Sequence, residues 1–461
     1  MTRSAVRLLT FALTVITASP AGAQSSPGPR LDPALLEREL DSARREQERS
    51  RRSDVPLPVL ARPQSAGSTK PLFKLTSVMV SGAKIFSSET IAETYRPYLG
   101  KTVSEADLSE IARLISELYR DAGFHLSRAI VPPQAIKSGV IRITVIEGSI
   151  SEVELKGGNS TRARQLLQPV IADQPARLAT LERQLLLVND IPGSRVRGST
   201  LEELGTATGL FRLTVDVETW RVYSTMGLDN RGIEAIGPLQ SHFSTALNSY
   251  FIPGDAAGFN LSTIPDAPRE LTFGQLWYEA PIGVSGSRFA LSAAYGEIWP
   301  SDERRLTGTR TRSESFEARF SSVPLRTRKS SLWLTASGGF ANISESEDLT
   351  ALYHDRVRTI ALSADYQFED KFGAWNYMTL TMRQGLNVFD ASESGDPFLS
   401  RVGGRPASQS SNSRSPEFIS SPKTGRSGFR RPVNGRRPHS LPPRNSILAA
   451  SFSAAAMKQE N

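Results

Sequence analysis

Apolar positions between Phe73 and Thr219 switch between strand-like and helix-like spacing, in an order that occurs twice. In the first unit, a strand-like run at 75–80 precedes helical patterns at 89–99 and after Ser104, then alternating runs at 124–131 and 140–147. The second unit repeats this order, with a strand at 153–155, helices at 161–171 and 178–188, and strands at 195–201 and 210–218. The duplication predicts two α+β modules of β-α-α-β-β order, at 73–148 and 149–219.

From Trp220 the spacing of apolar residues becomes two. Ile360, Leu362 and Ala364, for example, alternate with smaller or polar residues, and Trp and Tyr residues fall near strand ends or on one face. About eight such strands precede Ala391. Alternation of this kind, with strands near ten residues, predicts a transmembrane antiparallel β-barrel over 220–403. A soluble β-sandwich is the alternative interpretation.

The N-terminal 72 residues have three different compositions. Residues 1–23 combine Arg3 and Arg7, an apolar stretch and a small-residue cleavage site, which predicts a signal peptide and therefore export. Residues 31–52 form a predicted helix that is charged nearly all round, beginning with Asp32 as N-cap before Pro33. Either a solvated leader or a helix inside a wet pore fits this pattern. A Pro-rich, extended linker follows at 53–72.

Composition excludes several kinds of chemistry. The chain has no cysteine and only four, widely separated histidines, so disulfides, thiolate metal sites and cysteine nucleophiles are ruled out. We find no constellation with catalytic spacing, no phosphate loop and no metal-ligand cluster, and predict neither an enzyme nor a cofactor. The net charge of +8 lies within 404–461, a basic segment rich in Ser, Pro and Arg, so residues 1–403 are neutral and nucleic acid is not an expected partner.

Four segments together resemble a known family, the two-partner secretion transporters (hemolysin secretion/activation proteins) of Gram-negative outer membranes. The first two are Leu126-Ser127-Arg128-Ala129-Ile130-Val131-Pro132-Pro133-Gln134 and Val145-Ile146-Glu147-Gly148. The other two are Leu185-Leu186-Leu187-Val188-Asn189-Asp190-Ile191-Pro192-Gly193 and Leu228-Asp229-Asn230-Arg231-Gly232. The resemblance extends over roughly residues 1–403.

The resemblance implies a polypeptide transporter of the outer membrane, with its two modules, known as POTRA domains, in the periplasm. Its partner would be an unfolded exoprotein bearing a secretion domain, moved through the barrel without nucleotide; outer-membrane lipid and the barrel-assembly machinery are the other implied partners. The helix at 31–52 would be a pore plug, and its marker residues are Leu35, Leu36, Leu40, Arg45 and Arg49. The candidate substrate-peptide groove comprises Leu108, Ile111, Ile115, Phe124, Leu126, Arg128 and Ile130. Asn189, Asp190, Pro192 and Gly193 form a predicted structural turn.

The chain also departs from the family pattern. The family has sixteen strands, whereas about eight are predicted here, and 404–461 lacks period-two patterning. We interpret this segment as an out-of-frame continuation of an incomplete barrel, or as a disordered basic tail. Eight strands would enclose too narrow a space for a moving polypeptide. An alternative function is therefore a periplasmic binding or assembly module for outer-membrane proteins, acting through the POTRA pair.

Overall fold

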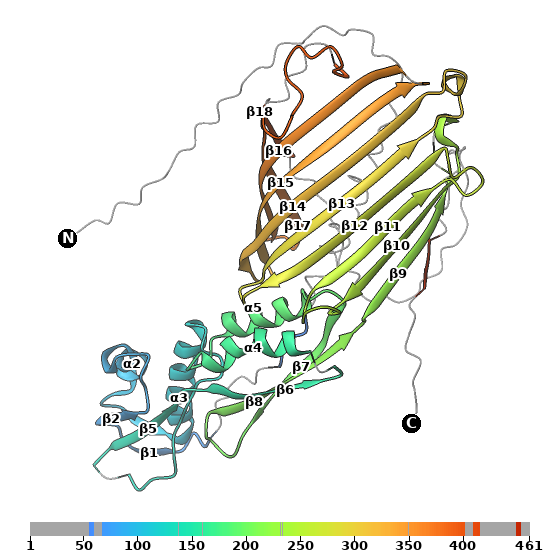
Figure 1. Cartoon of the computed structure of the whole chain (residues 1–461). Helices are drawn as coiled ribbons and strands as arrows, with labels where there is room; N and C mark the ends of the chain where they lie inside the picture. The colour runs from blue at the N-terminus through green and yellow to red at the C-terminus, as the bar shows by residue number, and fades with distance from the viewer. Residues whose placement is uncertain are drawn as a thin grey trace, which may run out of the picture.

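A computed structural model describes residues 55–59, 67–401, 409–414 and 449–452, except positions 137, 159, 231, 233 and 349. Two small α+β modules lie one after the other below a large antiparallel sheet (Figure 1). The predicted signal peptide and the predicted plug helix with Leu35, Leu36, Leu40, Arg45 and Arg49 lie outside the described residues, as does most of 404–461.

The first module places two helices against a three-stranded sheet. Its elements are β1 (Pro71–Lys74), β2 (Ser77–Ser81), α2 (Ser88–Tyr95), η1 (Arg96–Tyr98), β3 (Thr102–Ser104), α3 (Glu105–Asp121), β4 (Arg128–Ile130) and β5 (Val140–Ile146). The central strand β5 pairs in parallel with β2 and antiparallel with β4, and β1 pairs separately with β3. This confirms the predicted order and adds the small β1–β3 sheet.

Two local expectations for this module are corrected. Helix α2 starts at Ser88 and ends at Tyr95 rather than covering the predicted 89–99, and its N-cap is Ser87, whose hydroxyl accepts from the Thr90 amide at 3.2 Å. Strand β4 has three residues instead of the predicted 124–131. The amide of Ser127 donates to the carbonyl of Phe124, which makes a turn there, and Pro132 ends the ladder because proline lacks an N–H.

The second module repeats the arrangement. Its elements are β6 (Ser149–Lys156), α4 (Thr161–Ala172), α5 (Leu178–Asn189), β7 (Ser194–Glu203) and β8 (Leu210–Thr219), with strand order β6-β8-β7. The buried apolar faces of both helices pack on the sheet. Each module therefore has its own hydrophobic core, one centred on α3 and one on α4 and α5.

The large sheet is an antiparallel meander in which each strand pairs with its neighbours in sequence. Its consecutive strands are β9 (Val222–Asp229), β10 (Gln240–Asn248), β11 (Ala256–Thr263), β12 (Leu271–Ile282), β13 (Ser287–Ile298), β14 (Arg310–Arg326), β15 (Ser330–Glu347), β16 (Thr350–Glu369) and β17 (Trp375–Gly385). Strand β18 (Gln409–Arg414) pairs with β17, and β19 (Ala449–Phe452) pairs with β9. Short helical turns η2 (Glu234–Ile236) and η3 (Glu303–Arg305) lie in its loops.

The meander has nine strands before Ala391, one more than the predicted eight or so. The strand missing from the sequence-based count is β11, whose residues Ala256, Ala257 and Gly258 carry too little apolar side chain to reveal an alternating pattern. Among the described residues, no helix is both long and apolar enough to cross a membrane.

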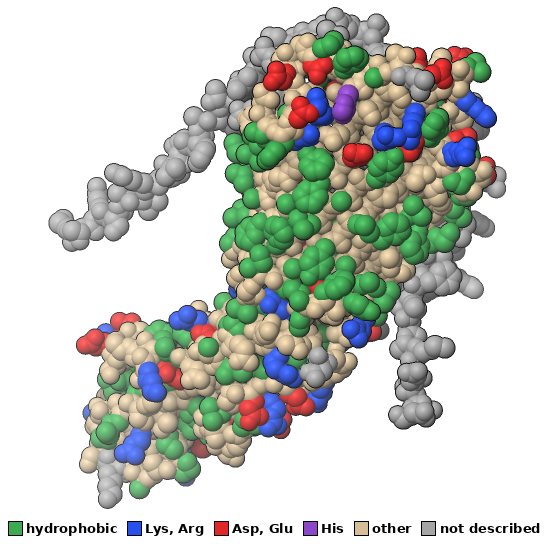
Figure 2. All heavy atoms as spheres, in the orientation of Figure 1, with side chains coloured by type: hydrophobic (Ala, Val, Ile, Leu, Met, Phe, Trp, Pro, Cys, Tyr) green, Lys and Arg blue, Asp and Glu red, His purple; other side chains and the backbone are tan. Residues whose placement is uncertain are grey.

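The two faces of the sheet differ in chemistry. On β16 and β17, Leu362 pairs with Met382 and Ala364 with Leu380, and these side chains share one face with Phe289, Phe316 and Phe340. Leu362 and Met382 are more than half exposed, and Figure 2 shows hydrophobic side chains spread over the sheet in this view. An apolar face this large requires a nonpolar environment.

Candidate functional site

The opposite face of the large sheet is polar and internally hydrogen-bonded. The Asn260 amide donates to Gln275 Oε1 at 2.7 Å, and the Ser244 hydroxyl donates to Asn260 Oδ1 at 2.7 Å. Further along the sheet, the Thr379 hydroxyl donates to Asp365 at 2.7 Å. Alternation along the strands places these groups opposite the exposed apolar side chains. One side of the sheet is thus suited to lipid and the other to water.

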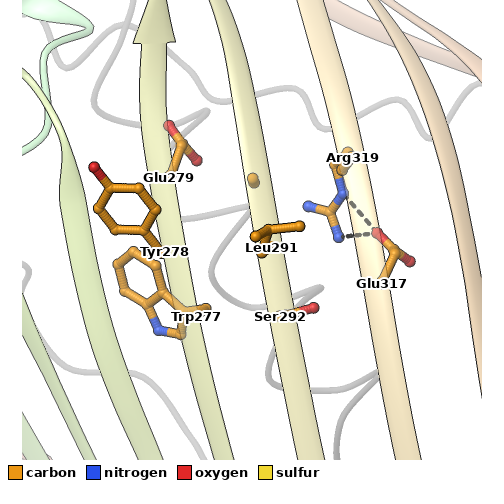
Figure 3. Close-up of a pocket in the computed structure, with 8 residues that line it drawn as sticks. Trp277, Tyr278, Glu279, Leu291, Ser292, Glu317 and Arg319 are labelled. Carbon is orange, nitrogen blue, oxygen red and sulfur yellow. Dashed lines mark hydrogen bonds and ion pairs between the residues drawn. The ribbon is translucent and has the colours of Figure 1, made fainter.

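Charged side chains also lie on the polar face, between β12 and β14. Figure 3 shows Glu317 and Arg319 on β14, joined by an ion pair with an N–O distance of 2.6 Å, and, across β13 from them, Glu279 and Trp277 on β12. Trp277 lies over Gly258, where an added Cβ would come within 2.2 Å of the indole ring. A small residue at 258 therefore leaves room for this ring on the polar face.

Helix α5 of the second module docks against the adjacent strand ends. Arg326, at the end of β14, donates from Nε and Nη2 to the two carboxylate oxygens of Asp190 at 2.8 and 2.9 Å. Arg183 of α5 donates to the carbonyls of Ser285 and Val323 at 3.1 and 2.9 Å. Figure 1 shows α5 directly below these strand ends. The module and the sheet are therefore linked by charge-assisted hydrogen bonds.

A cleft lies between this helix pair and the polar face. Its lining includes Arg162 and Leu166 from α4, Asp190, and the polar-face residues Arg319 and Asp365. Burial lowers the pKa of the Arg162 guanidinium, and the nearby charge of Arg288 lowers it further. The polar face is thus continuous with the surface of the second module.

Most of the predicted groove residues are core residues. Leu108, Ile111 and Ile115 of α3 are buried in the first module, as is Phe124, while Leu126 belongs to the core of the second module. Their side chains are enclosed and face no open groove in this structure. Helical spacing of apolar residues is the same for a core face and for a groove, so the sequence could not separate them.

Arg128 and Ile130 are the two groove residues that retain exposure, both on β4. Arg128 bridges the modules, donating to both carboxylate oxygens of Glu203 at 2.8 and 2.9 Å. Burial would raise the pKa of Glu203, but hydrogen bonds from Arg128 and Gly209 outweigh this and hold the pKa below its usual value. Arg128 is thus engaged with the second module, and a role for it in binding peptide stays a prediction.

Two of the family-like segments have clear structural roles. Glu147 Oε1 accepts from the amides of Lys84 and Ile85 at 2.7 and 2.9 Å and from the Tyr119 hydroxyl at 2.8 Å. Gln134 exchanges two 2.8 Å hydrogen bonds with the backbone of Arg142 on β5, as a strand partner would. These residues hold segments of the first module together by hydrogen bonds and do not line a site.

The predicted turn begins at Asn189, the last residue of α5, and ends at Gly193, just before β7. The Asn189 side chain accepts from the Val196 amide at 3.0 Å, and Gly193 has a positive φ of 66°. Asp190 has the additional contact with Arg326, which its position in the sequence did not indicate. Pro192 lies in the same segment, between Ile191 and Gly193. Within the described ranges, no three His, Asp or Glu side chains gather to hold a metal ion.

Comparisons with known proteins agree with this geometry. Residues 73–148 match the family of the POTRA domain, ShlB-type. The heme/hemopexin transporter protein HuxB of Haemophilus influenzae is 24% identical over 372 residues, or 78% of this chain and 63% of HuxB. The outer membrane transporter CdiB of Escherichia coli is 25% identical over 240 residues, or 51% of this chain and 40% of CdiB.

The fold is also that of solved CdiB structures. CdiB from Escherichia coli matches with a TM-score of 0.62 at 19% identity, covering 81% of this chain and 72% of that chain. CdiB from Acinetobacter baumannii matches with a TM-score of 0.51 at 14% identity, covering 77% and 70%. These structural matches confirm the predicted fold class. The POTRA-domain match and the HuxB and CdiB sequences confirm the resemblance to outer-membrane transporters. The chain spans about 63% of the length of the HuxB relative.

Proposed function

We propose that this chain is an outer-membrane polypeptide transporter of two-partner secretion, with its POTRA modules in the periplasm. In this proposal the modules bind an unfolded exoprotein carrying a secretion domain and pass it to the polar face of the sheet. Two relatives, HuxB and CdiB, are named as transporters, which supports transport over catalysis. We accordingly propose that the chain is not an enzyme and that movement of the polypeptide uses no nucleotide.

The observation that carries the proposal is the division of the sheet into two faces. Leu362 and Ser363 are neighbours on β16, yet Leu362 stands among exposed apolar side chains, while the Ser363 hydroxyl lies 3.0 Å from that of Thr381 on the polar face. In a membrane, the first face suits lipid and the second suits a hydrated polypeptide. The polar face also meets the cleft beside α4 and α5, so a segment leaving the second module would reach it directly.

Closure of the wall is a requirement of this proposal. An open strand edge exposes backbone N–H and C=O groups, which hydrocarbon does not solvate, so lipid-facing edges have to be paired. The described sheet is open, with β18 and β19 as its end strands. We infer that transport requires strands beyond the described ones to complete the wall, consistent with the sixteen that the resemblance implies. Their assembly would involve the barrel-assembly machinery.

The proposal is tested by comparing the proteins in the culture medium of the source bacterium with and without this gene. We expect at least one large polypeptide to disappear from the medium when the gene is deleted and to return when the gene is restored. An unchanged set of secreted proteins would contradict transport. Because all secreted proteins are compared, the exoprotein is identified by the experiment itself.

A second candidate function is a periplasmic binding or assembly module for outer-membrane proteins. The observation that favours it is the edge strand β2, which pairs only with β5 among the described strands and exposes Met79. An unpaired edge can bind extended polypeptide by strand addition. Under this alternative, deletion of the gene would reduce outer-membrane protein levels and leave the medium unchanged.

A further inference from the structure

A short piece of the N-terminal linker is inserted into the second module. Residues 55–59 form neither helix nor strand, and Val55 has no exposed surface; it belongs to the core cluster formed by α4, α5 and the sheet of this module. Leu57 packs against the same cluster, whereas Val59 is 96% exposed. A segment that the sequence presents as a spacer thus contributes a core residue to a domain that begins some ninety residues later.

The inserted segment contacts an edge strand. The Ser199 hydroxyl of β7 donates to the Pro56 carbonyl at 2.8 Å. Strand β7 pairs with β8 on one side and, among the described strands, has no partner on the other. This segment lies beside a free strand edge with one aliphatic side chain buried, which is where strand addition would place an unfolded polypeptide.

The linker cannot form all the backbone hydrogen bonds that the free edge of β7 offers. Pro56 and Pro58 have no N–H, so two backbone donors are missing within five residues. A polypeptide with ordinary residues at these positions has more donors to offer β7. The linker is nevertheless hard to displace, because a short tether gives it an effective concentration in the millimolar range.

We propose that the apolar position beside β7 that holds Val55 is a second binding site for extended polypeptide with an aliphatic side chain, occupied in cis by residues 55–59 until an exoprotein segment displaces them. The inference rests on the proposed function, since it identifies a place where the transported chain is received. Displacement would free the linker, which connects the modules to the predicted plug helix at 31–52. Arrival of substrate at the second module would thereby be communicated to the N-terminal segment.

The first test measures peptide binding to the full chain in detergent micelles by fluorescence anisotropy. The probe is a fluorescein-labelled peptide of residues 53–60 with Pro56→Thr and Pro58→Thr. Removing the buried valine methyls in Val55→Ser weakens the cis contact, so we expect this variant to bind the probe about tenfold or more tightly than the unmodified chain. Val59→Ser is the matched control, because it makes the same change at an exposed position, and should bind as the unmodified chain does.

Equal affinity of the Val55→Ser and Val59→Ser chains would overturn the proposal, as would no binding by any of the three. A second variant guards against misfolding. The chain has no natural cysteine, so Pro56→Cys with Ser199→Cys can be joined by a short bis-maleimide. We expect the joined protein to lose probe binding and the same protein before joining to retain it. Equal binding before and after joining would also overturn the proposal.

These outcomes are separable from failure of the transport proposal. If Val55→Ser has no effect on peptide binding while the medium still loses a polypeptide on gene deletion, only the inference about the linker fails. If peptide binding changes as expected while the medium is unchanged, the transport proposal fails and the binding-module alternative is favoured.

Discussion

Arg326 at the end of β14 and Asp190 at the end of α5 form a two-point ion pair that joins the large sheet to the second module. The Arg326 side chain is 2% exposed and that of Asp190 10%, and the guanidinium lies 5.8 Å from the centre of the Trp333 ring. It also donates to Ser331 at 2.9 Å. Its hydrogen bonds therefore fix the angle at which α5 meets the strand ends.

Removing one partner of this ion pair should destabilise the folded chain. Arg326→Ala leaves the Asp190 carboxylate buried without its main donor, so we expect a loss of about 3 to 5 kcal/mol in the free energy of unfolding. Urea unfolding of the full chain in micelles, followed by tryptophan fluorescence, measures this. Arg113→Ala is the control, because Arg113 pairs with Glu110 and Glu117 on a solvent-accessible helix face and should cost less than about 1 kcal/mol. Equal losses would contradict the role assigned to the junction.

The capping box of α3 should make the first module sensitive to acid. The amide and hydroxyl of Ser104 donate to Asp107 and lower the pKa of its carboxyl. A lowered pKa contributes stability that is present above the unfolded value, about 3.9 for aspartate, and is lost as the pH falls through the folded pKa. Unfolding curves of the unmodified chain and Asp107→Asn should therefore differ at pH 6 and converge below about pH 4. A constant difference would contradict this.

The same cap can be tested by substitution. Ser104→Ala leaves the Asp107 amide without its side-chain acceptor, so we expect a loss of about 1 kcal/mol in unfolding free energy at neutral pH. Hydrogen exchange at the first turn of α3 should rise in parallel. Exchange unchanged at this turn would show that the cap does not limit its opening.

Glu147 should hold the loop after β2 in place. Burial raises the pKa of the Tyr119 hydroxyl, and its hydrogen bond to Glu147 raises it further, so the tyrosine donates to the carboxylate at physiological pH. Tyr119→Phe removes one of three donors to Glu147, whereas Glu147→Ala leaves all three donors without their acceptor. We expect Glu147→Ala to cost at least about 1 kcal/mol more in unfolding free energy than Tyr119→Phe, measured by urea unfolding. Equal costs would mean that the amides of Lys84 and Ile85 find other acceptors.

Even the small substitution Gly148→Ala should destabilise the folded chain. A Cβ there would lie 2.4 Å from the Leu126 carbonyl oxygen, a backbone atom with little room to move, so Gly148→Ala should destabilise the chain by about 1 to 3 kcal/mol. Gly198→Ala is the control, since a Cβ at that position would meet no atom within 4 Å. Thermal unfolding in micelles distinguishes the two, and similar melting temperatures would be inconsistent with the close approach at Gly148.

Periodicity predicted the modules well and the contacts between distant residues poorly. The expected helix at 161–171 is α4 at Thr161–Ala172, because its N-cap and its apolar spacing are local signals. The sequence-based count missed strand β11 because its alanine and glycine residues show no alternation of apolar and polar side chains. The Asp190–Arg326 pair joins residues far apart in sequence, and nothing in either neighbourhood indicates the other.

The functional residues were harder to predict for two physical reasons. Leu108, Ile111 and Ile115 have the spacing of a groove and of a core alike, and the structure places them in the core. Val55 stands alone among prolines and had no periodic partner to mark it, although it is fully buried. The polar face of the sheet, by contrast, follows directly from the period-two pattern, which supports the transport proposal.

The most direct test of that proposal is cross-linking in living cells from a photoreactive residue placed on β16. At position 363, on the polar face, we expect adducts with a secreted polypeptide captured in transit; at position 362, on the apolar face, we expect none. Polypeptide adducts from both positions, or from neither, would contradict the assignment of the polar face as the path of transport.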